Sequence, residues 1–269
     1  MRFNILGPME VLHDGHSCTP TAPKVRRVLA LLLLRANQIV DTEALIDELW
    51  FDNPPRSAVT TTQTYIYQLR KIFARMMPED EAARVLLTQA PGYGLALTDD
   101  QLDVKMFERL SEEGRALAED GRLGEASKRL NEALRLWRGR ALADVIAGSV
   151  LEAHVVHLEE MRIRTLELRV RTDLQLGKHR ELVPELRSLV SQHPLNEWFH
   201  AQLITVLQRT GRRCEALQVY QDLRRSLDTE LGLEPSIPLR RLQRELLNGE
   251  DEHLSDVTTL ATSGLAVAL

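Results

Sequence analysis

The spacing of apolar residues divides the chain into a short mixed region and a longer helical region. Near the start, polar and apolar residues alternate within residues 2–6 and within residues 10–13, and Gly7 and Pro8 separate the two segments. Asp14 and Gly15 favour a turn after the second segment, so we expect short strands there. After a polar break at residues 98–100, apolar residues recur almost throughout at helical spacing. We therefore expect mainly α structure with small β elements.

Three helices are predicted between residues 23 and 76. The first begins after Pro23, Asp41 or Thr42 can cap the second, and Ser57 can cap the third, which runs to about Met76. One stripe of the third helix has spacings of four, four, three and four, and we expect it to be buried: Ala58, Thr62, Ile66, Leu69 and Phe73.

A β-hairpin is predicted after the third helix, because residues 84–97 alternate and contain a turn signal at residues 91–94. Strands, three helices and a hairpin within residues 1–98 are the element order of a winged helix-turn-helix. In that fold the second and third helices form the helix-turn-helix and the hairpin forms the wing.

The second half, residues 103–247, contains three similar segments at 122–137, 178–190 and 212–227. Each follows a helix that ends in glycine, and each begins with a basic residue and carries spaced apolar positions. This pattern resembles tetratricopeptide helix hairpins, with a longer central helix over about 151–176. Residues 249–269 lack an amphipathic period and contain no Lys or Arg, so we expect most of them to be disordered.

Composition narrows the class of protein. The chain has 269 residues, of which 43% are hydrophobic and 27% charged, as in folded soluble proteins. Its two cysteines are far apart and no Cys/His spacing suggests zinc, so we expect no metal and no cofactor. We expect no signal peptide, no membrane span and no catalytic motif, which indicates a cytoplasmic protein that is not an enzyme.

Net charge alone does not indicate a nucleic-acid partner. The formal charge is −5, and residues 1–98 contain ten basic and ten acidic residues. Any basic surface that attracts DNA must therefore be local, and it must come from how the charges are arranged.

Several short motifs occur in a fixed order along the chain. They are ELW at 48–50, PP at 54–55, QTYIYQLRK at 63–71, PGYGL at 91–95, the Trp137 region, LVPELRSLVSQHPL at 182–195 and ELGLEPS at 230–236. Together they resemble the Streptomyces antibiotic regulatory protein (SARP) family. That family joins an OmpR-type winged helix-turn-helix, here 1–98, to a bacterial transcriptional activation domain of tetratricopeptide-like helices, here 103–247.

The resemblance implies a function. Such proteins activate secondary-metabolite (antibiotic) gene clusters, bind direct repeats of double-stranded DNA near the promoter as dimers or multimers, and engage the sigma factor and core subunits of RNA polymerase. The alternative is a tetratricopeptide-type interaction or scaffold module without specific DNA binding.

Polar side chains opposite the buried stripe of the third helix are the candidate base contacts, because base edges in the major groove are recognised by hydrogen bonds. Gln68 could pair with an adenine edge and Thr64 could meet a thymine methyl. The alternative is an ordinary solvated helix face. The candidates are Thr60, Gln63, Thr64, Tyr67 and Gln68.

Long cationic side chains near these residues are the candidate phosphate contacts, because they neutralise backbone charge without needing a fixed register. The three at the start of the first helix could instead form a simple solvated patch. The candidates are Lys24, Arg26, Arg27, Arg56, Arg70, Lys71 and Arg75.

The wing and the loop before the third helix provide the remaining candidates. Thr88 and Gln89 lie near the expected hairpin tip and Arg84 at its base, while Gly92 and Gly94 are expected to serve the turn. The loop at 50–55 either covers the core through Trp50 or contacts polymerase through Trp50 and Asp52. His154 and His157 fit a helical surface pair better than a metal site, since no third ligand is evident.

Overall fold

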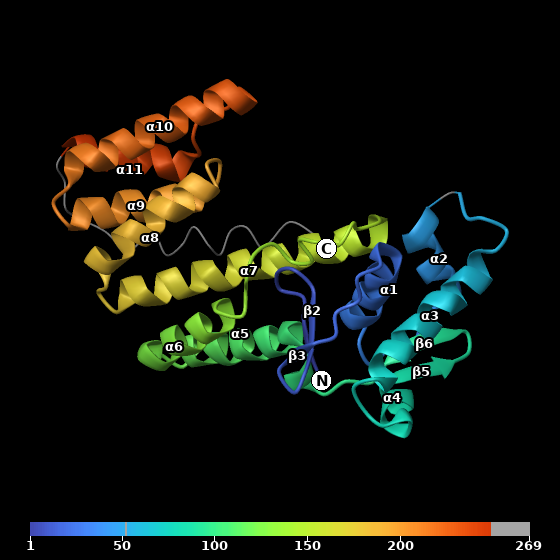
Figure 1. Ribbon diagram of the computed structural model, residues 1–269. Coiled ribbons are helices and arrows are strands. Elements are labelled where there is room, and N and C mark those ends of the chain that lie inside the picture. Colours follow the sequence, from blue (N-terminus) through green and yellow to red (C-terminus); the bar gives the residue numbers. More distant parts are fainter. Residues whose placement is uncertain (52, 249–269) are drawn as a thin grey trace. The chain divides into compact units, whose positions relative to one another are not determined.

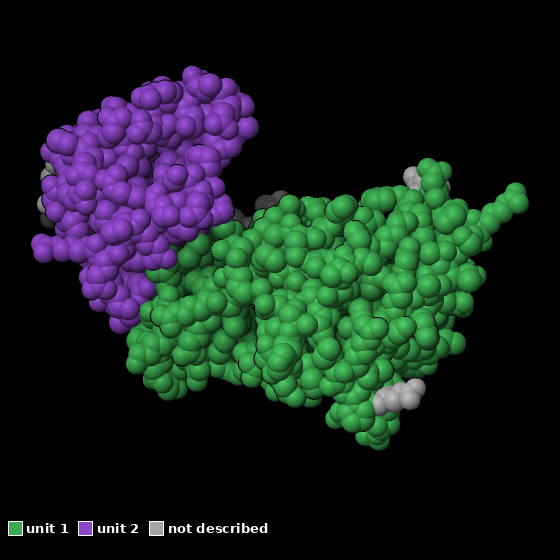
Figure 2. Space-filling model, in the orientation of Figure 1, with its two compact units in different colours: residues 1–172 green, residues 173–269 purple. Residues whose placement is uncertain are grey.

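The computed structural model describes residues 1–51 and 53–248, so the predictions for Asp52 and for disorder over 249–269 lie outside the described residues. The chain forms two compact units, which divide after Thr172 (Figure 2). Helices dominate both units, and small antiparallel sheets occur in the first (Figure 1). The predicted fold class is therefore confirmed. No helix among the described residues is long and apolar enough to span a membrane.

The first sheet contains three antiparallel strands in the order β1-β2-β3, namely β1 (Arg2–Asn4), β2 (Glu10–His13) and β3 (His16–Ser17). Phe3 pairs with Val11 in its register. Strand β1 is shorter than the alternating pattern predicts, because the amides of Ile5 and Leu6 donate to the side chain of Asp103 instead of to a neighbouring strand.

The predicted three helices follow, as α1 (Pro23–Leu34), α2 (Thr42–Trp50) and α3 (Ala58–Ala74). The five residues of the predicted stripe on α3 are all buried. A second sheet has the order β4-β6-β5, formed by β4 (Val40–Asp41), β5 (Leu86–Gln89) and β6 (Gly92–Leu95). The hairpin β5–β6 occupies the position of a wing.

Two details of the predicted hairpin are wrong. Residues 79–85 form an additional helix, α4 (Glu79–Val85), so Arg84 lies in the last turn of that helix and not at the base of the hairpin. The turn is at Ala90 and Pro91, and Gly92 lies in β6. A Cβ atom at Gly92 would lie 1.9 Å from the carbonyl oxygen of Val40, so the glycine allows β4 to approach closely.

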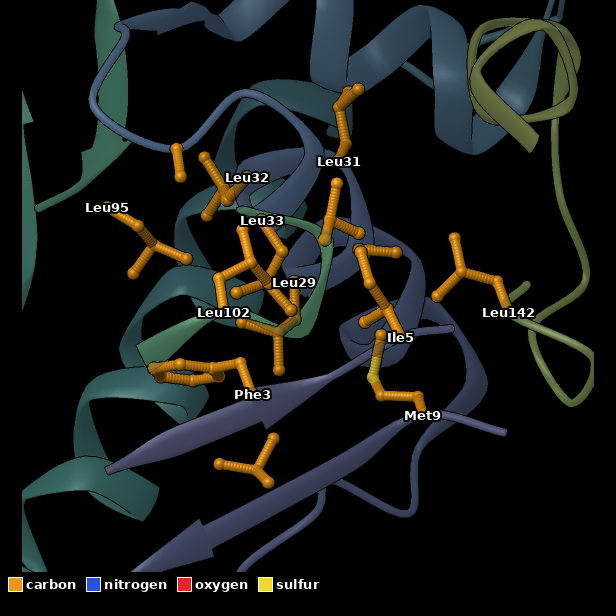
Figure 3. Packing of buried hydrophobic residues seen from close by; sticks show 14 of the residues in the cluster. Phe3, Ile5, Met9, Leu29, Leu31, Leu32, Leu33, Leu95, Leu102 and Leu142 are labelled. Carbon is orange, nitrogen blue, oxygen red and sulfur yellow. The ribbon is translucent and has the colours of Figure 1, made fainter. Parts of the chain in front are cut away.

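One hydrophobic core lies beneath both sheets of the first unit. Phe3 and Phe73 meet edge to face at 6.1 Å between ring centroids, which joins β1 to α3. Figure 3 shows Leu142, from the segment after α6, lying near Ile5 and Met9 in the same core. The core therefore includes residues on both sides of the polar break at 98–100.

The remaining helices of the first unit pack as a hairpin followed by a long helix. They follow the short 3-10 helix η1 (Asp99–Gln101) and are α5 (Asp103–Glu119), α6 (Leu123–Leu134) and α7 (Ser149–Gln175), whose last residues enter the second unit. The second unit contains α8 (His179–Gln192), α9 (Glu197–Arg209), α10 (Arg213–Leu231) and α11 (Ile237–Asn248).

The glycines that mark the predicted helix hairpins occupy left-handed backbone conformations. Gly121, Gly177 and Gly211 have φ of 75°, 77° and 77°, respectively. Each lies directly between two helices, where a residue with positive φ ends the first helix and glycine adopts it without strain. The expected repeat of helix, glycine turn and helix is therefore present three times.

Candidate nucleic-acid interface

Helix α3 presents a polar face opposite its buried stripe. The five candidate base contacts, Thr60, Gln63, Thr64, Tyr67 and Gln68, are all exposed. Tyr67 is the most exposed large hydrophobic residue of the helix, with 63% of its surface accessible. The sequence pattern thus predicted correctly which side chains face solvent, and their contact with bases stays a prediction.

The hydrogen bonds on this face limit what each side chain can offer a base. The Thr64 hydroxyl donates to the carbonyl oxygen of Thr60 at 2.9 Å, so its proton is already used within the helix. Its methyl group and its remaining acceptor capacity stay available, and a methyl group suits contact with thymine. The geometry of Thr64 is therefore compatible with the role expected of it.

Gln68 lies at one edge of the polar face, not on its ridge. Together with Lys71 and Arg75 it lines a hollow of about 210 Å³, whose other side is formed by residues 20–22 and Val25 next to the start of α1. Gln63 lies almost opposite Gln68 around the helix, one turn away from Tyr67. Two amide side chains are thus available, one on each flank of the face.

The charge on and beside α3 is entirely positive. Residues 56–75 contain four basic residues and no acidic residue, although residues 1–98 as a whole are neutral. Arg56, Lys71 and Arg75 are exposed, and no ion pair with them occurs among the described residues. A local positive potential therefore lies beside the polar face, although the net charge of residues 1–98 is zero.

Arg26 and Arg27 do not belong to this free positive surface, because both guanidinium groups already have partners within the protein. Arg26 forms an ion pair with Asp144, and Arg27 donates to the carbonyl oxygens of Glu48 and Leu49 at 3.2 and 3.4 Å. Their side chains are only 14% and 15% exposed. Sequence patterns could not reveal this, because the partners are distant in the chain.

Lys24 differs from its two neighbours. It is half-buried like them, but it forms no ion pair among the described residues, and its ammonium group lies 4.5 Å from the centre of the Trp50 ring, a cation–π contact. The side chain can exchange this contact for a phosphate, since a cation–π contact contributes only about 0.5–2 kcal/mol.

The hairpin β5–β6 is linked to the rest of the interface at two points. Arg70 donates a hydrogen bond to the hydroxyl of Thr88, so a predicted phosphate contact and a predicted wing residue meet each other. The carbonyl oxygen of Pro91 accepts from the Thr42 hydroxyl at 3.1 Å, which holds the hairpin tip near the start of α2. Thr88 and Gln89 remain exposed, and Arg84 faces Asp80 at 3.9 Å.

The loop between α2 and α3 exposes a different aromatic residue from the one predicted. Trp50 is half-buried and packs against the core, whereas Phe51 is 52% exposed with a φ of 53°. A positive φ is unusual for a bulky residue and directs the chain sharply away from the end of α2. The sequence analysis missed Phe51; its signal was an aromatic residue placed after the last buried position of the helix.

Three carboxylates that the sequence analysis did not single out as functional are strongly engaged in this unit. They are Glu48, which is 1% exposed, Asp103, which is 5% exposed, and Asp144. Burial raises the pKa of the Asp103 carboxyl to about 6, although the amides of Ile5 and Leu6 act to lower it. These carboxylates could not be identified from the sequence, because hydrogen bonds to backbone groups far along the chain produce no periodic pattern of residues.

His154 and His157 lie on α7, as the helical spacing predicted. Burial lowers the pKa of His154, and the nearby Arg35 contributes in the same direction. In the part of the chain that the structure describes, no three His, Cys, Asp or Glu side chains gather in a way that could hold a metal ion.

Comparison with known proteins identifies the family. Residues 102–247 match the family model of the bacterial transcriptional activator domain, and residues 16–95 match that of the C-terminal domain of transcriptional regulatory proteins. The chain is 44% identical to the regulatory protein DnrI of Streptomyces peucetius, over 99% of this chain and all of DnrI. The chain belongs to the SARP family. This SARP protein is thus a transcription regulator, and its relatives are regulators and not enzymes.

Other relatives are longer than this SARP protein. It is 36% identical to the regulatory protein AfsR of Streptomyces coelicolor over its whole length, which is about a quarter (26%) of AfsR. It also matches the solved structure of Mycobacterium tuberculosis EmbR in complex with a low affinity phosphopeptide, with 30% identity and a TM-score of 0.87. That match covers 97% of this chain and 68% of the EmbR chain.

Proposed function

We propose that the protein activates transcription of a secondary-metabolite gene cluster by binding direct repeats of double-stranded DNA with α3 in the major groove. The observation that carries the proposal is the exposed face of α3, which joins hydrogen-bonding side chains to four basic residues without an acid. Such a face complements base edges and phosphates together. The antibiotic pathway is inferred from the family, and activity on DNA implies a cytoplasmic location.

Base recognition is assigned to the ridge and flanks of α3. Thr60, Thr64 and Tyr67 point away from the buried stripe, and Gln63 and Gln68 flank them. A glutamine amide can donate to and accept from one adenine edge, which makes it the most discriminating group of this set. Direct repeats would be occupied by two or more copies of the chain, one on each repeat.

Phosphate contacts are assigned to Arg56, Lys71 and Arg75, with Lys24 at the start of α1. Arg26 and Arg27 are left out because their guanidinium groups pair inside the protein. Arg70 is expected to place the wing through Thr88, and Gln89 is the wing side chain that remains without a partner among the described residues.

Polymerase recruitment is assigned to the loop between α2 and α3. Phe51 adds an exposed aromatic side chain to the expected contacts of Trp50 and Asp52 with the sigma factor. Aromatic residues are enriched where protein surfaces bind partners, so Phe51 is the stronger candidate of the two aromatics. Contact with core subunits of the polymerase is part of the same proposal.

A gel-shift titration at several salt concentrations tests DNA binding. We expect the full chain to shift promoter fragments from its own gene neighbourhood, with affinity falling steeply as salt rises. Lys71→Ala should weaken all sequences alike and reduce the magnitude of the salt slope by about one. Lys128→Ala, which removes an exposed cation from α6, is the matched control and should leave the slope unchanged.

Base recognition is tested separately. Gln68→Ala should relax sequence preference by about 1–3 kcal/mol at one base pair while keeping the salt slope. If specificity stays intact while Gln63→Ala relaxes it, the opposite flank of α3 faces the bases. The absence of any shift at low salt would contradict the proposal and favour an interaction module instead.

A further inference from the structure

Three carboxylates connect residues 1–98 to the helices that follow them. The Glu48 carboxylate, at the end of α2, accepts hydrogen bonds from the backbone amides of Gly148 and Leu151. Gly148 directly precedes α7 and Leu151 lies in its first turn, where the initial N–H groups of a helix have no partner within the helix. Glu48 therefore caps a helix that lies 100 residues further along the chain.

The second carboxylate, Asp103, belongs to the helical region and accepts hydrogen bonds from backbone amides near the start of the chain. It is the first residue of α5 and accepts from the amide of Ile5 at 2.8 and 2.9 Å and from that of Leu6 at 2.9 Å. The guanidinium group of Arg138 lies 3.9 Å from a carboxylate oxygen of Asp103. The third, Asp144, accepts from the amide of Met9 at 2.7 Å and pairs with Arg26.

The backbone around these contacts leaves little room for rearrangement. The amides of Arg138 and Leu142 donate to the carbonyl oxygens of Leu6 and Ile5 at 2.7 and 3.0 Å. A Cβ atom on Gly148 would lie 2.6 Å from the carbonyl oxygen of Glu48. The two parts of the unit therefore meet through buried hydrogen bonds and close backbone contact.

The chemistry of these contacts makes them cooperative. A buried carboxylate is stable only while its partners stay in place, because an unpaired charge or amide in the interior costs far more than the net gain from one hydrogen bond. Arg27, 3.8 Å from Glu48, and Arg138 near Asp103 supply the compensating charges. Opening the contact at Glu48 would leave both its carboxylate and the amides at the start of α7 without hydrogen-bond partners.

We propose that Glu48, Asp103 and Asp144, called here the carboxylate bridge, make the winged-helix region and helices α5 to α7 a single cooperative unit. Within it, Glu48 is a positioning residue that fixes the end of α2, and therefore the start of the loop that leads to α3, on the first turn of α7. The smallest stable form of the DNA-binding region then extends through α7 and does not end at residue 98. This inference does not depend on DNA binding.

Native-state hydrogen exchange of the full chain tests the bridge. In the parent protein, the amides of Leu31 in α1, Leu110 in α5 and Leu151 in α7 should share one opening reaction, with the same dependence on added urea. Separate opening of α1 and α5, each with its own urea dependence, would overturn the proposal without any variant.

Glu48→Gln tests the residue, and Asp47→Asn is its control, since Asp47 is exposed on the same helix. We expect Glu48→Gln to speed exchange at Leu151 at least tenfold and to separate the opening of α1 from that of α5. Asp47→Asn should change neither. Equal behaviour of the two variants would overturn the assignment of Glu48. Should Glu48→Gln not fold, Asp103→Asn, which is expected to speed exchange at Ile5 and Leu6, decides in its place.

Discussion

Replacing Gly92 by alanine tests why the wing strand contains glycine. The added methyl carbon would lie 1.9 Å from the carbonyl oxygen of Val40 and 2.7 Å from its carbonyl carbon, both backbone atoms. Ordinary contact between carbon and oxygen needs more than 3 Å, so β4 and β6 must separate by over an ångström. That movement breaks the pairing of Val40 with Tyr93 and of Asp41 with Gly92.

The expected cost follows from the hydrogen bonds lost. Each net bond contributes about 1 kcal/mol, and a buried group left without a partner costs about 1–3 kcal/mol. We therefore expect Gly92→Ala to lower the free energy of unfolding by roughly 2–4 kcal/mol. Urea unfolding of the full chain, followed by the fluorescence of Trp50 and the other tryptophans, measures the change.

Gly124 supplies the control. It lies in the first turn of α6, and a Cβ atom there would meet no atom within 4 Å. Gly124→Ala should raise the free energy of unfolding by up to about 1 kcal/mol, because alanine loses less backbone entropy in a helix. If Gly92→Ala were as stable as the parent protein, the close approach of β4 would not be the reason for the glycine.

Two further predictions concern stability. Phe73→Ala should lower the free energy of unfolding by about 3–5 kcal/mol, because it leaves a cavity beside Phe3. Tyr67→Ala, on the exposed face of α3, should change that free energy by less than about 0.5 kcal/mol. Equal effects of the two substitutions in urea unfolding would contradict the assignment of the two faces. Because the pKa of Asp103 is raised from 3.8 to about 6 by folding, the native state binds the proton more tightly, so its contribution to stability is full below pH 4 and is lost as pH rises through 6. The midpoints of urea unfolding at pH 5 and at pH 8 should therefore differ less in Asp103→Asn than in the parent protein. If the difference between the two midpoints were the same in both proteins, groups other than Asp103 would cause the pH dependence.

The sequence pattern was most informative where structure depends on neighbours along the chain. The stripe from Ala58 to Phe73 and the glycines that end helices were predicted correctly, because helical periodicity and positive φ are local properties. The pattern missed the short helix at residues 79–85, of which only residues 84 and 85 fall within the predicted hairpin. A run of seven residues is too short for periodicity to identify a helix.

The sequence by itself determined the order of the first strands, the three helices α1 to α3 and the hairpin, as well as the exposed face of α3 and its positive charge, since each follows from residues a few positions apart. Tertiary structure decided which cations remain free: Arg26 and Arg27 look like Lys71 and Arg75 in sequence, yet they pair with Asp144 and with the end of α2. It also decided where the first unit ends. The partners of Glu48 and Asp103 lie about 100 residues away, and only folding brings a carboxylate and a distant helix start within hydrogen-bond distance.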